Sequence, residues 1–126
     1  ETGNVIGYFS LANDRVSLTD FNNKTEFNRF RRTRFVNEKR IKSYPAVKIC
    51  RLGIDNSLRG KGIGSMLLDF IKYFFIENNK TGCRFLTVDA YNNAIEFYRN
   101  NNFKHLKEQE EDKITSSLYF DLNDIY

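Results

Sequence analysis

The sequence predicts a mixed α/β domain in which a mostly antiparallel sheet is built around a central parallel strand–helix–strand unit. Segments rich in β-branched and aromatic residues alternate with segments whose apolar residues recur at helical spacing. In the middle of the chain, a strand, a helix and a second strand follow one another within about 45 residues, a unit that pairs its strands in parallel. The 126 residues suffice for one domain, which we expect to span residues 1–126.

The first part of the chain is expected to form a β-hairpin and a short helix. Residues 5–11 are rich in β-branched and aromatic side chains, Asn13-Asp14 has the composition of a turn, and residues 16–19 follow as a returning strand. Residues 22–43 are polar and basic, with a few apolar residues that would form one side of a short helix. Those residues are Phe27, Phe30, Phe35 and Val36.

The central unit begins after Pro45, with residues 46–54 as a mostly buried strand. A Gly-rich turn follows, and apolar residues then recur at helical spacing until the helix ends near Asn78. These apolar residues are Ile63, Leu67, Phe70, Ile71, Phe74 and Phe75. Gly82 precedes the second strand of the unit, residues 83–90.

A short helix and two strands complete the predicted fold. Asn92 or Asn93 is expected to cap the helix, with Glu96 as the partner in a capping box, and the helix should end near Asn101. Two further strands should flank an acidic loop at residues 108–112. These strands are residues 103–106 and 117–122.

Composition narrows the function classes. The formal net charge of +4 suits an anionic cofactor, an acidic substrate or nucleic acid. Cys50 and Cys83 form no CxxC pair and His105 has no ligand-like neighbour, so we expect no metal site and two buried free thiols in a reducing cytoplasm. No apolar run reaches the roughly 18 residues that a membrane-spanning helix needs, and no apolar signal segment follows the polar start.

The most informative motif is the Gly-rich turn that joins a buried strand to an amphipathic helix. Three glycines within five positions allow positive φ angles and close approach of a ligand to the backbone. The free amides at the helix start and the helix dipole favour an anion there, and Arg59 and Lys61 add full charges. The spacing is neither GxGxxG nor GxxxxGK[ST]. We therefore predict a pyrophosphate site at residues 59–65, with a Gly-rich turn that binds nothing as the alternative.

The motif resembles the acetyl-CoA signature of the Gcn5-related N-acetyltransferase (GNAT) superfamily, an Arg or Gln followed by x-x-Gly-x-Gly or Ala. The match continues through residues 88–90 and 96–98 to Phe103, where the family carries a Phe-Tyr…Gly-Phe ending. It covers residues 3–122 and is specific from Pro45 to Phe103. The acetyltransferase toxins of bacterial toxin–antitoxin pairs are similar in particular, with a basic segment before a Gly-Arg-Leu-Ala-Val-like strand.

The resemblance implies two parallel strands, residues 46–54 and 83–90, that separate towards their carboxyl ends. Pantetheine would lie in the opening, the pyrophosphate would rest on the amides of the turn, and the thioester would face the helix that carries Tyr98. The cofactor would be acetyl-CoA, without a metal. The residues expected to contact it are Leu52, Gly53, Ile54, Arg59, Gly60, Lys61, Gly62, Ile63, Gly64, Ser65 and Asn92.

Tyr98 resembles the general acid of the family. A phenol with a pKa near 10 can protonate a thiolate whose pKa is nearer 8.5, and packing of the ring under the sheet is the structural alternative. Main-chain N–H groups near residues 52–54 would polarise the thioester carbonyl. Asp55, Asp89 and Glu96 are each candidates for the general base.

The acceptor is left open between three hypotheses. The first is an N-acetyltransferase that acts on a small-molecule or protein amine. The second is a toxin-like enzyme that acts on aminoacyl-tRNA, held by the basic segment of residues 29–42, for which a solvated helix face and loop is the structural alternative. An α-amine with a pKa near 8 keeps a neutral fraction at pH 7, which makes a base dispensable. The third is a fragment that binds coenzyme A (CoA) without catalysis. Association into a homodimer is a further alternative.

The chain also departs from the family pattern. It starts at what resembles the second strand, so we expect an N-terminally truncated domain that lacks the first strand and two helices. Asn101-Asn102 replaces the usual Gly, with an Asn in the left-handed position after the helix. Tyr91 stands where relatives have a cofactor-facing Asn, and Asn92 comes one position later.

Overall fold

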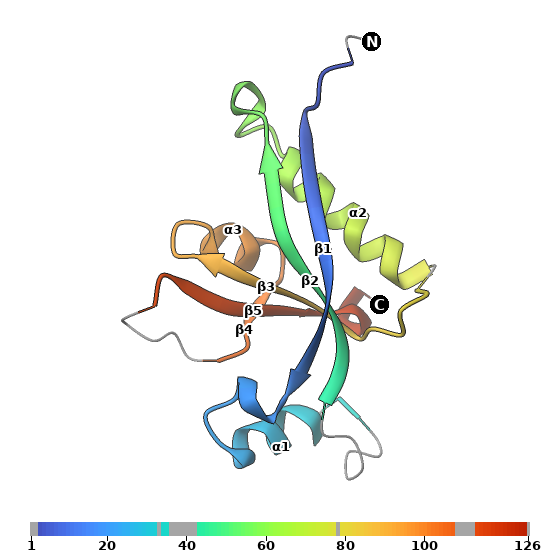
Figure 1. Ribbon diagram of the computed structural model, residues 1–126, viewed down its shortest axis with the longest axis vertical. Coiled ribbons are helices and arrows are strands. Elements are labelled where there is room, and N and C mark those ends of the chain that lie inside the picture. The colour runs from blue at the N-terminus through green and yellow to red at the C-terminus, as the bar shows by residue number, and fades with distance from the viewer. Residues whose placement is uncertain (1–2, 33, 36–42, 78, 108–112, 126) are drawn as a thin grey trace.

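Five strands form one mixed sheet in the computed structural model, which describes residues 3–32, 34–35, 43–77, 79–107 and 113–125 (Figure 1). Their order across the sheet is β1-β2-β3-β5-β4, and only β2 and β3 pair in parallel. The strands are β1 (Gly7–Ser17), β2 (Ser43–Ile54), β3 (Phe85–Tyr91), β4 (Lys104–His105) and β5 (Thr115–Asp121). The predicted fold class, a mostly antiparallel sheet around a parallel strand–helix–strand unit, is confirmed.

Three α-helices and three short 3₁₀ turns connect the strands in the described residues. The helix α2 follows β2 and leads to β3, so β2, α2 and β3 are the predicted central unit. The helices are α1 (Lys24–Arg32), α2 (Ile63–Glu77) and α3 (Ile95–Asn100). The 3₁₀ turns are η1 (Leu18–Asp20), η3 (Asn56–Leu58) and η4 (Leu122–Ile125).

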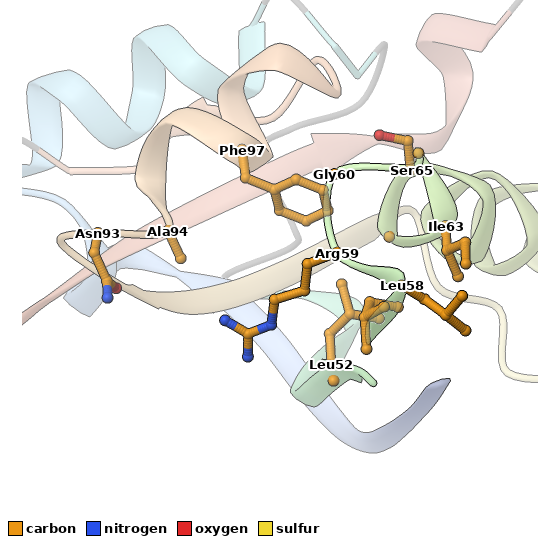
Figure 2. Close-up of a pocket in the computed structure, with 13 residues that line it drawn as sticks. Leu52, Leu58, Arg59, Gly60, Ile63, Ser65, Asn93, Ala94 and Phe97 are labelled. Carbon is orange, nitrogen blue, oxygen red and sulfur yellow. The ribbon is translucent and has the colours of Figure 1, made fainter. Parts of the chain in front are cut away.

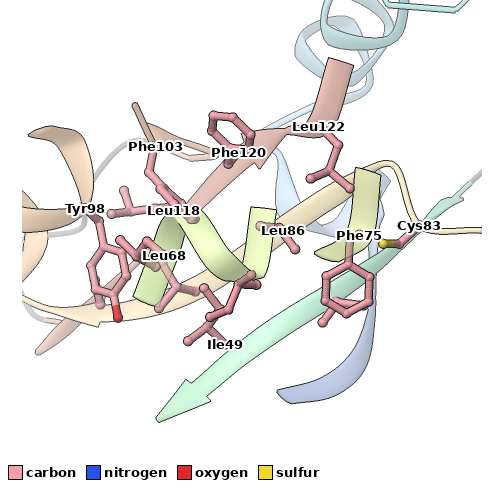
Figure 3. Close-up of a cluster of buried hydrophobic side chains, with 14 residues drawn as sticks. Ile49, Leu68, Phe75, Cys83, Leu86, Tyr98, Phe103, Leu118, Phe120 and Leu122 are labelled. Carbon is pink, nitrogen blue, oxygen red and sulfur yellow. The ribbon is translucent and has the colours of Figure 1, made fainter. Parts of the chain in front are cut away.

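The larger hydrophobic core lies between the sheet and the helices α2 and α3 (Figure 3). Alternate residues of β3 and β5 point into it, among them Leu86 and Leu118, which are fully buried. Leu68 and Ile71 of α2 meet these side chains, because they lie three residues apart on one face of the helix. This core fixes α2 and α3 on the same side of the sheet.

A second, aromatic core lies on the opposite face, under α1. The alternate strand residues, such as Phe85 and Tyr119, point to this face, as the two-residue period of a strand requires. Phe30 of α1 packs against both, with ring centroids 5.4 Å from Phe85 and 5.3 Å from Tyr119. The predicted helical residues Phe27 and Phe30 are thus buried.

Beyond α1, polar pairs occupy this second face of the sheet. Lys48 Nζ lies 3.0 Å from a carboxylate oxygen of Asp89, whose other oxygen accepts a hydrogen bond from Ser117 at 3.2 Å. The Asp14 carboxylate accepts a hydrogen bond from the Thr87 hydroxyl at 2.5 Å. The two faces of the sheet therefore differ, one apolar along its length and the other partly polar.

The predicted N-terminal hairpin is wrong. Residues 7–17 form one continuous strand, and Asn13 and Asp14 pair with Val47 and Ala46 of β2 instead of turning the chain. Twelve residues of β2 offer a partner to the whole length of β1, and tertiary pairing overrides the turn preference of Asn and Asp.

The predicted capping box of the short helix is also wrong. Ala94 is the N-cap of α3 and makes no side-chain capping bond. Asn92 and Asn93 are instead the central residues of a preceding turn, which is closed by a 2.8 Å hydrogen bond from the Ala94 amide to the Tyr91 carbonyl. The left-handed residue after α3 is Asn102, with φ 70°, as predicted.

Other predictions about the fold have mixed outcomes. The helix after the Gly-rich turn ends at Glu77, close to the predicted Asn78. Cys83 is buried, whereas Cys50 is exposed, so the prediction of two buried thiols holds for Cys83 alone. Val36 and the acidic loop at residues 108–112 lie outside the described residues.

The carboxylate of Asp121 joins the segment after α1 to the sheet. It is 3% exposed and lies 3.3 Å from Arg34 Nε and 2.6 Å from Arg84 Nε. Both guanidinium groups are only partly exposed, so removal of the carboxylate leaves two poorly solvated positive charges facing each other.

We expect Asp121→Ala to lower the free energy of unfolding by about 3 kcal/mol, measured by urea denaturation. Asp124→Ala, at an exposed carboxylate in the following turn, is the control and should cost less than about 0.5 kcal/mol. Equal effects of the two substitutions would contradict a structural role for the buried carboxylate.

Candidate functional site

The site begins where β2 and β3 stop pairing. Their parallel register runs from Ala46–Phe85 to Ile49–Val88, yet β2 continues to Ile54 and β3 to Tyr91. The two strands therefore separate towards their carboxyl ends, as the family resemblance implied.

A β-bulge in β2 coincides with this point. Ser10 of β1 pairs with Arg51, whereas the next residue, Leu11, pairs with Ile49, which leaves Cys50 without a partner in β1. An extra residue of this kind bends its strand and increases the local twist. The bulge thus gives a physical cause for the departure of β2 from β3 directly after Ile49, and it accounts for the exposed thiol.

The main chain of the last part of β2 faces the opening. The Asp55 amide donates to the Ile6 carbonyl at 2.9 Å, which fixes the direction of the neighbouring main-chain groups. Because these groups alternate along an antiparallel strand, those of Gly53 point to β1, and those of Leu52 and Ile54 point away from it. No described strand pairs with Leu52 and Ile54 on this side, so their peptide groups face the gap, the kind of surface an extended amide-bearing chain can pair with.

The Gly-rich turn presents a row of free amides beside this opening. Gly60 and Gly62 both have φ +78°, which orients the backbone in a way that other residues rarely adopt. In the part of the chain that the structure describes, the amides of residues 60–65 have no backbone acceptor, and the first helical bond runs from the Met66 amide to the Gly62 carbonyl at 3.1 Å. Six donors without a backbone acceptor therefore lie in succession at the positive end of the α2 dipole.

Arg59 differs from the rest of the predicted pyrophosphate site. Its amide is engaged with the Asn56 carbonyl at 3.4 Å, so the row of free donors starts at Gly60 and not at Arg59. Its side chain is exposed and extends from the turn towards the side on which Asn93 lies (Figure 2). Arg59 can thus contribute through its guanidinium group.

A pocket of about 540 Å³ fills the space between the end of β2, the turn and the start of α3 (Figure 2). Nine of the eleven predicted contact residues line it, and Lys61 and Asn92 do not. The nine are Leu52, Gly53, Ile54, Arg59, Gly60, Gly62, Ile63, Gly64 and Ser65. Four lining residues were not predicted from the sequence, namely Leu58, Asn93, Ala94 and Phe97.

Gly64 allows α2 and α3 to meet at the pocket. A Cβ atom at Gly64 would lie 3.0 Å from Cζ of Phe97, so the Phe97 ring rests on the bare backbone of α2. Ala94 and Phe97 lie three residues apart and face the pocket together. The three-residue spacing of Ala94 and Phe97 could have indicated that both face the pocket and form its wall on the α3 side. That Asn93 lines the pocket, and not the predicted Asn92, depends on a turn that no local sequence pattern specified.

Tyr98 is not among the residues that line the pocket; it lies beside Phe97, at one end of the larger core (Figure 3). It is 6% exposed, and its ring packs against Phe97 at 5.1 Å and Phe103 at 5.4 Å between centroids. Burial raises the pKa of Tyr98, so the phenol is protonated at neutral pH. In the described part of the chain, its hydroxyl donates no hydrogen bond to protein, which leaves the proton available to another acceptor.

The three carboxylates considered as a general base are placed elsewhere. Asp55 accepts hydrogen bonds from the amide and hydroxyl of Ser57, and Asp89 pairs with Lys48. Glu96 is exposed on α3. None of the three is among the residues that line the pocket.

Among the described arginines of the basic segment, two contact other protein groups and two are exposed to solvent. Arg34 is tied to Asp121 and to the Tyr119 hydroxyl at 2.8 Å, and the Arg31 guanidinium lies over the Phe27 ring at 4.9 Å. Arg29 and Arg32 are exposed on α1. The remaining basic residues of the segment, Lys39, Arg40 and Lys42, lie outside the described residues.

The described residues contain no group of three or more potential metal ligands. None of the described helices is both long and apolar enough to span a membrane.

Fold and pocket together define an α/β domain with a ligand-sized pocket beyond the carboxyl ends of two separating parallel strands. The chain belongs to the GNAT acetyltransferase family, because the model of the acetyltransferase (GNAT) domain matches residues 20–105.

Solved structures of similar fold include proteins described as toxins. A structure described as a bacterial toxin has a TM-score of 0.72 at 18% identity, covering 98% of this chain and 64% of that one. AtaTR bound with acetyl-CoA has a TM-score of 0.66 at 26% identity, covering 95% and 63%. AtaT complexed with acetyl-methionyl-tRNAfMet has a TM-score of 0.65 at 23% identity, covering 95% and 64%.

This chain thus spans a little under two thirds of the length of these proteins. Among curated proteins, none matches it.

Proposed function

We propose that this chain binds acetyl-CoA in the pocket and transfers its acetyl group to a primary amine, with Tyr98 as the general acid. The observation that carries the proposal is the row of free amides at residues 60–65, next to the opening between β2 and β3. A diphosphate needs several convergent donors, and a helix start lined with glycine supplies them without side chains in the way.

The pocket suits the rest of the cofactor as well. The unpaired peptide groups of Leu52 and Ile54 can hydrogen-bond to the two amides of pantetheine, as a neighbouring strand would. Phe97 and Ala94 provide an apolar wall on the α3 side. The pantetheine arm would thereby run from the turn into the opening, towards the helix that carries Tyr98.

The chemistry then requires one proton transfer to sulfur. The neutral amine nitrogen attacks the carbonyl carbon of the thioester, the carbon–sulfur bond breaks, and the departing thiolate takes the Tyr98 proton. The nitrogen loses one proton to water and the Tyr98 phenolate takes one back from water, so the products are the amide and the free thiol of CoA. The raised pKa keeps the phenol protonated at neutral pH, so Tyr98 has a proton to donate. A thiol with a pKa near 8.5 is a stronger acid than a phenol near 10, so this transfer is uphill by about 2 kcal/mol or more and is drawn forward by the breaking of the carbon–sulfur bond. Peptide N–H groups of β2 in the opening would stabilise the oxyanion.

Gly62→Ala should weaken the binding of CoA about tenfold, because alanine disfavours φ +78° and turns amides away from the diphosphate. Gly82→Ala is the matched control, since Gly82 has φ +71° in a turn elsewhere and an equally open surrounding. Both variants should lose about 1–2 kcal/mol of stability. Calorimetric titration with CoA should distinguish them, and equal affinities would exclude the turn as the diphosphate site.

Tyr98→Phe should slow turnover about 100- to 10,000-fold and leave CoA affinity within about twofold, because only the transferable proton is removed. Turnover is measured as thiol release with spermidine, a lysine peptide and a methionyl-tRNA. Tyr73→Phe, at an exposed tyrosine of α2, is the control. An unchanged rate in the Tyr98 variant would remove the acid role. Binding of CoA without thiol release from any of the amines would favour a non-catalytic domain.

A second candidate acceptor is aminoacyl-tRNA. The similar structures are toxins, and one of them is complexed with acetyl-methionyl-tRNAfMet. No candidate base lines the pocket, and an α-amine with a pKa near 8 retains a neutral fraction without one. Arg29 and Arg32 are exposed on α1 and available to phosphates. The helix α1 lies near the end of β2 opposite the turn, and β2 is at most roughly 35 Å long at about 3.3 Å per residue, a length that a tRNA can bridge.

The double variant Arg29→Ala/Arg32→Ala should bind methionyl-tRNA about tenfold more weakly than the unsubstituted chain. The slope of log K against log salt concentration should fall in magnitude by about two, one for each lost phosphate contact. Lys80→Ala/Lys104→Ala removes the same charge from exposed positions elsewhere and is the control. Filter binding between 50 and 200 mM salt, about the range in which phosphate contacts are lost, measures both. Binding that is insensitive to salt would count against an RNA acceptor.

A further inference from the structure

Lys72 is a buried lysine that the proposed chemistry does not use. It lies on α2 and is 5% exposed, although lysine head groups normally remain in water. Burial lowers the pKa of Lys72, and the negative charge of Asp69, one helical turn earlier, opposes this shift. Among the described residues no carboxylate forms a salt bridge with Lys72, so its burial needs another explanation.

The polar partner of Lys72 is the end of α3. Its Nζ donates to the Asn101 carbonyl at 2.6 Å, and Asn101 is the C-cap of that helix. The amides of Asn101 and Phe103 both donate to the Tyr98 carbonyl at 3.0 Å, and the turn passes through the left-handed Asn102. A positive charge at this point stabilises the negative end of the helix and the carbonyls left without helical partners.

The apolar partners of Lys72 lead to the same tyrosine. Its Nζ lies 4.2 Å from the centroid of the Phe120 ring and 5.6 Å from that of Phe103. The Phe103 ring in turn packs against the Tyr98 ring at 5.4 Å, and Figure 3 shows the three aromatic side chains in the same cluster. A lysine cation over aromatic faces is attracted by their negative potential. Lys72 therefore holds the turn after α3 both through the Asn101 carbonyl and through the neighbouring Phe103 ring.

The helix α3 is therefore attached to α2 at two points. One is the contact between Gly64 and Phe97 at the pocket, and the other is the bond from Lys72 to Asn101. The two α2 residues are eight positions apart, about 12 Å along the helix axis. Tyr98 lies on α3 between these attachments, next to Phe97 and one turn before Asn101.

We propose that Lys72 is a positioning residue, which holds the C-terminal turn of α3 so that the Tyr98 hydroxyl faces the reacting sulfur. This inference rests on the proposed acid role of Tyr98. In this role Lys72 contacts neither substrate. Its loss should affect the proton transfer and leave cofactor binding intact, because the proposed diphosphate site lies near the Gly64–Phe97 contact and not near Lys72.

Lys72→Met retains the length of the side chain and removes its charge and donors. We expect its kcat to fall about tenfold, with the KM for acetyl-CoA within about twofold, since small displacements of a catalytic group are costly. Lys72→Arg, which can still donate to the Asn101 carbonyl, should recover at least half of the rate. The rate is that of thiol release with the fastest of the three amines named above. Lys80→Met, at an exposed lysine, is the control.

A double-mutant cycle separates positioning from general damage. If Lys72 acts through Tyr98, Lys72→Met/Tyr98→Phe should be no slower than Tyr98→Phe alone, because residues that act as a unit are not additive. Multiplicative losses in the double variant, or an unchanged kcat in Lys72→Met, would overturn the proposal. Loss of rate together with loss of CoA affinity would do the same.

A measurement that does not involve turnover tests the role of Lys72 independently of whether Tyr98 is the general acid. The ¹³C resonance of the Tyr98 ring carbon that bears the hydroxyl is assigned by its absence in Tyr98→Phe and followed with pH. Lys72→Met should change the apparent pKa of that phenol, because the packing around the ring changes, and Lys72→Arg should leave it unchanged. An unaltered titration overturns the role of Lys72, whereas a Tyr98→Phe variant with full activity overturns the acid role instead.

Discussion

The separation of β2 from β3 is the constraint on which the rest of the site depends. Two parallel strands that pair along their full length leave no main-chain group free between them. Here the pairing ends at Ile49 and Val88, and the extra residue Cys50 turns β2 away. The peptide groups of Leu52 and Ile54 become available, and the helix that follows β2 starts beside the gap instead of above a closed sheet. One inserted residue thus converts a continuous sheet into a binding surface.

The two hydrophobic cores hold this opening at a fixed width. On one face α2 and α3 are packed against β3 and β5, so both walls of the pocket rest on the same apolar layer. On the other face α1 covers only part of the sheet, and the aromatic cluster around Phe85 holds the strands where they still pair. The strands are therefore clamped at one end and free at the other. Such an arrangement lets the free end carry polar function without loss of the fold.

Much of the fold was predictable because its signals are local. The period of Ile63, Leu67 and Ile71 gave α2, and the glycines gave the position of the turn with most of its lining residues. The failures have non-local causes. Asn13 and Asp14 favour a turn, yet a partner strand some 30 residues later keeps them extended, a pairing that no window of sequence contains.

The exposure of Cys50 and the place of Asn93 follow from a bulge and a turn that depend on register. The burial of Lys72 could not be predicted from the sequence either, because a lysine in an amphipathic helix ordinarily lies on the solvent-exposed face.

The buried Asp121 has a consequence for the order in which the chain assembles. Its two arginine partners stand 87 and 37 positions earlier, so Arg34, in the segment after α1, gains this partner only once β5 exists. During synthesis the residues before β5 emerge first, so Phe30 can pack on Phe21 and Phe85 before its contact with Tyr119 of β5 exists. The strand β5 thus completes the cover of α1, and until it forms, the side of this aromatic, positively charged helix that meets Tyr119 remains exposed.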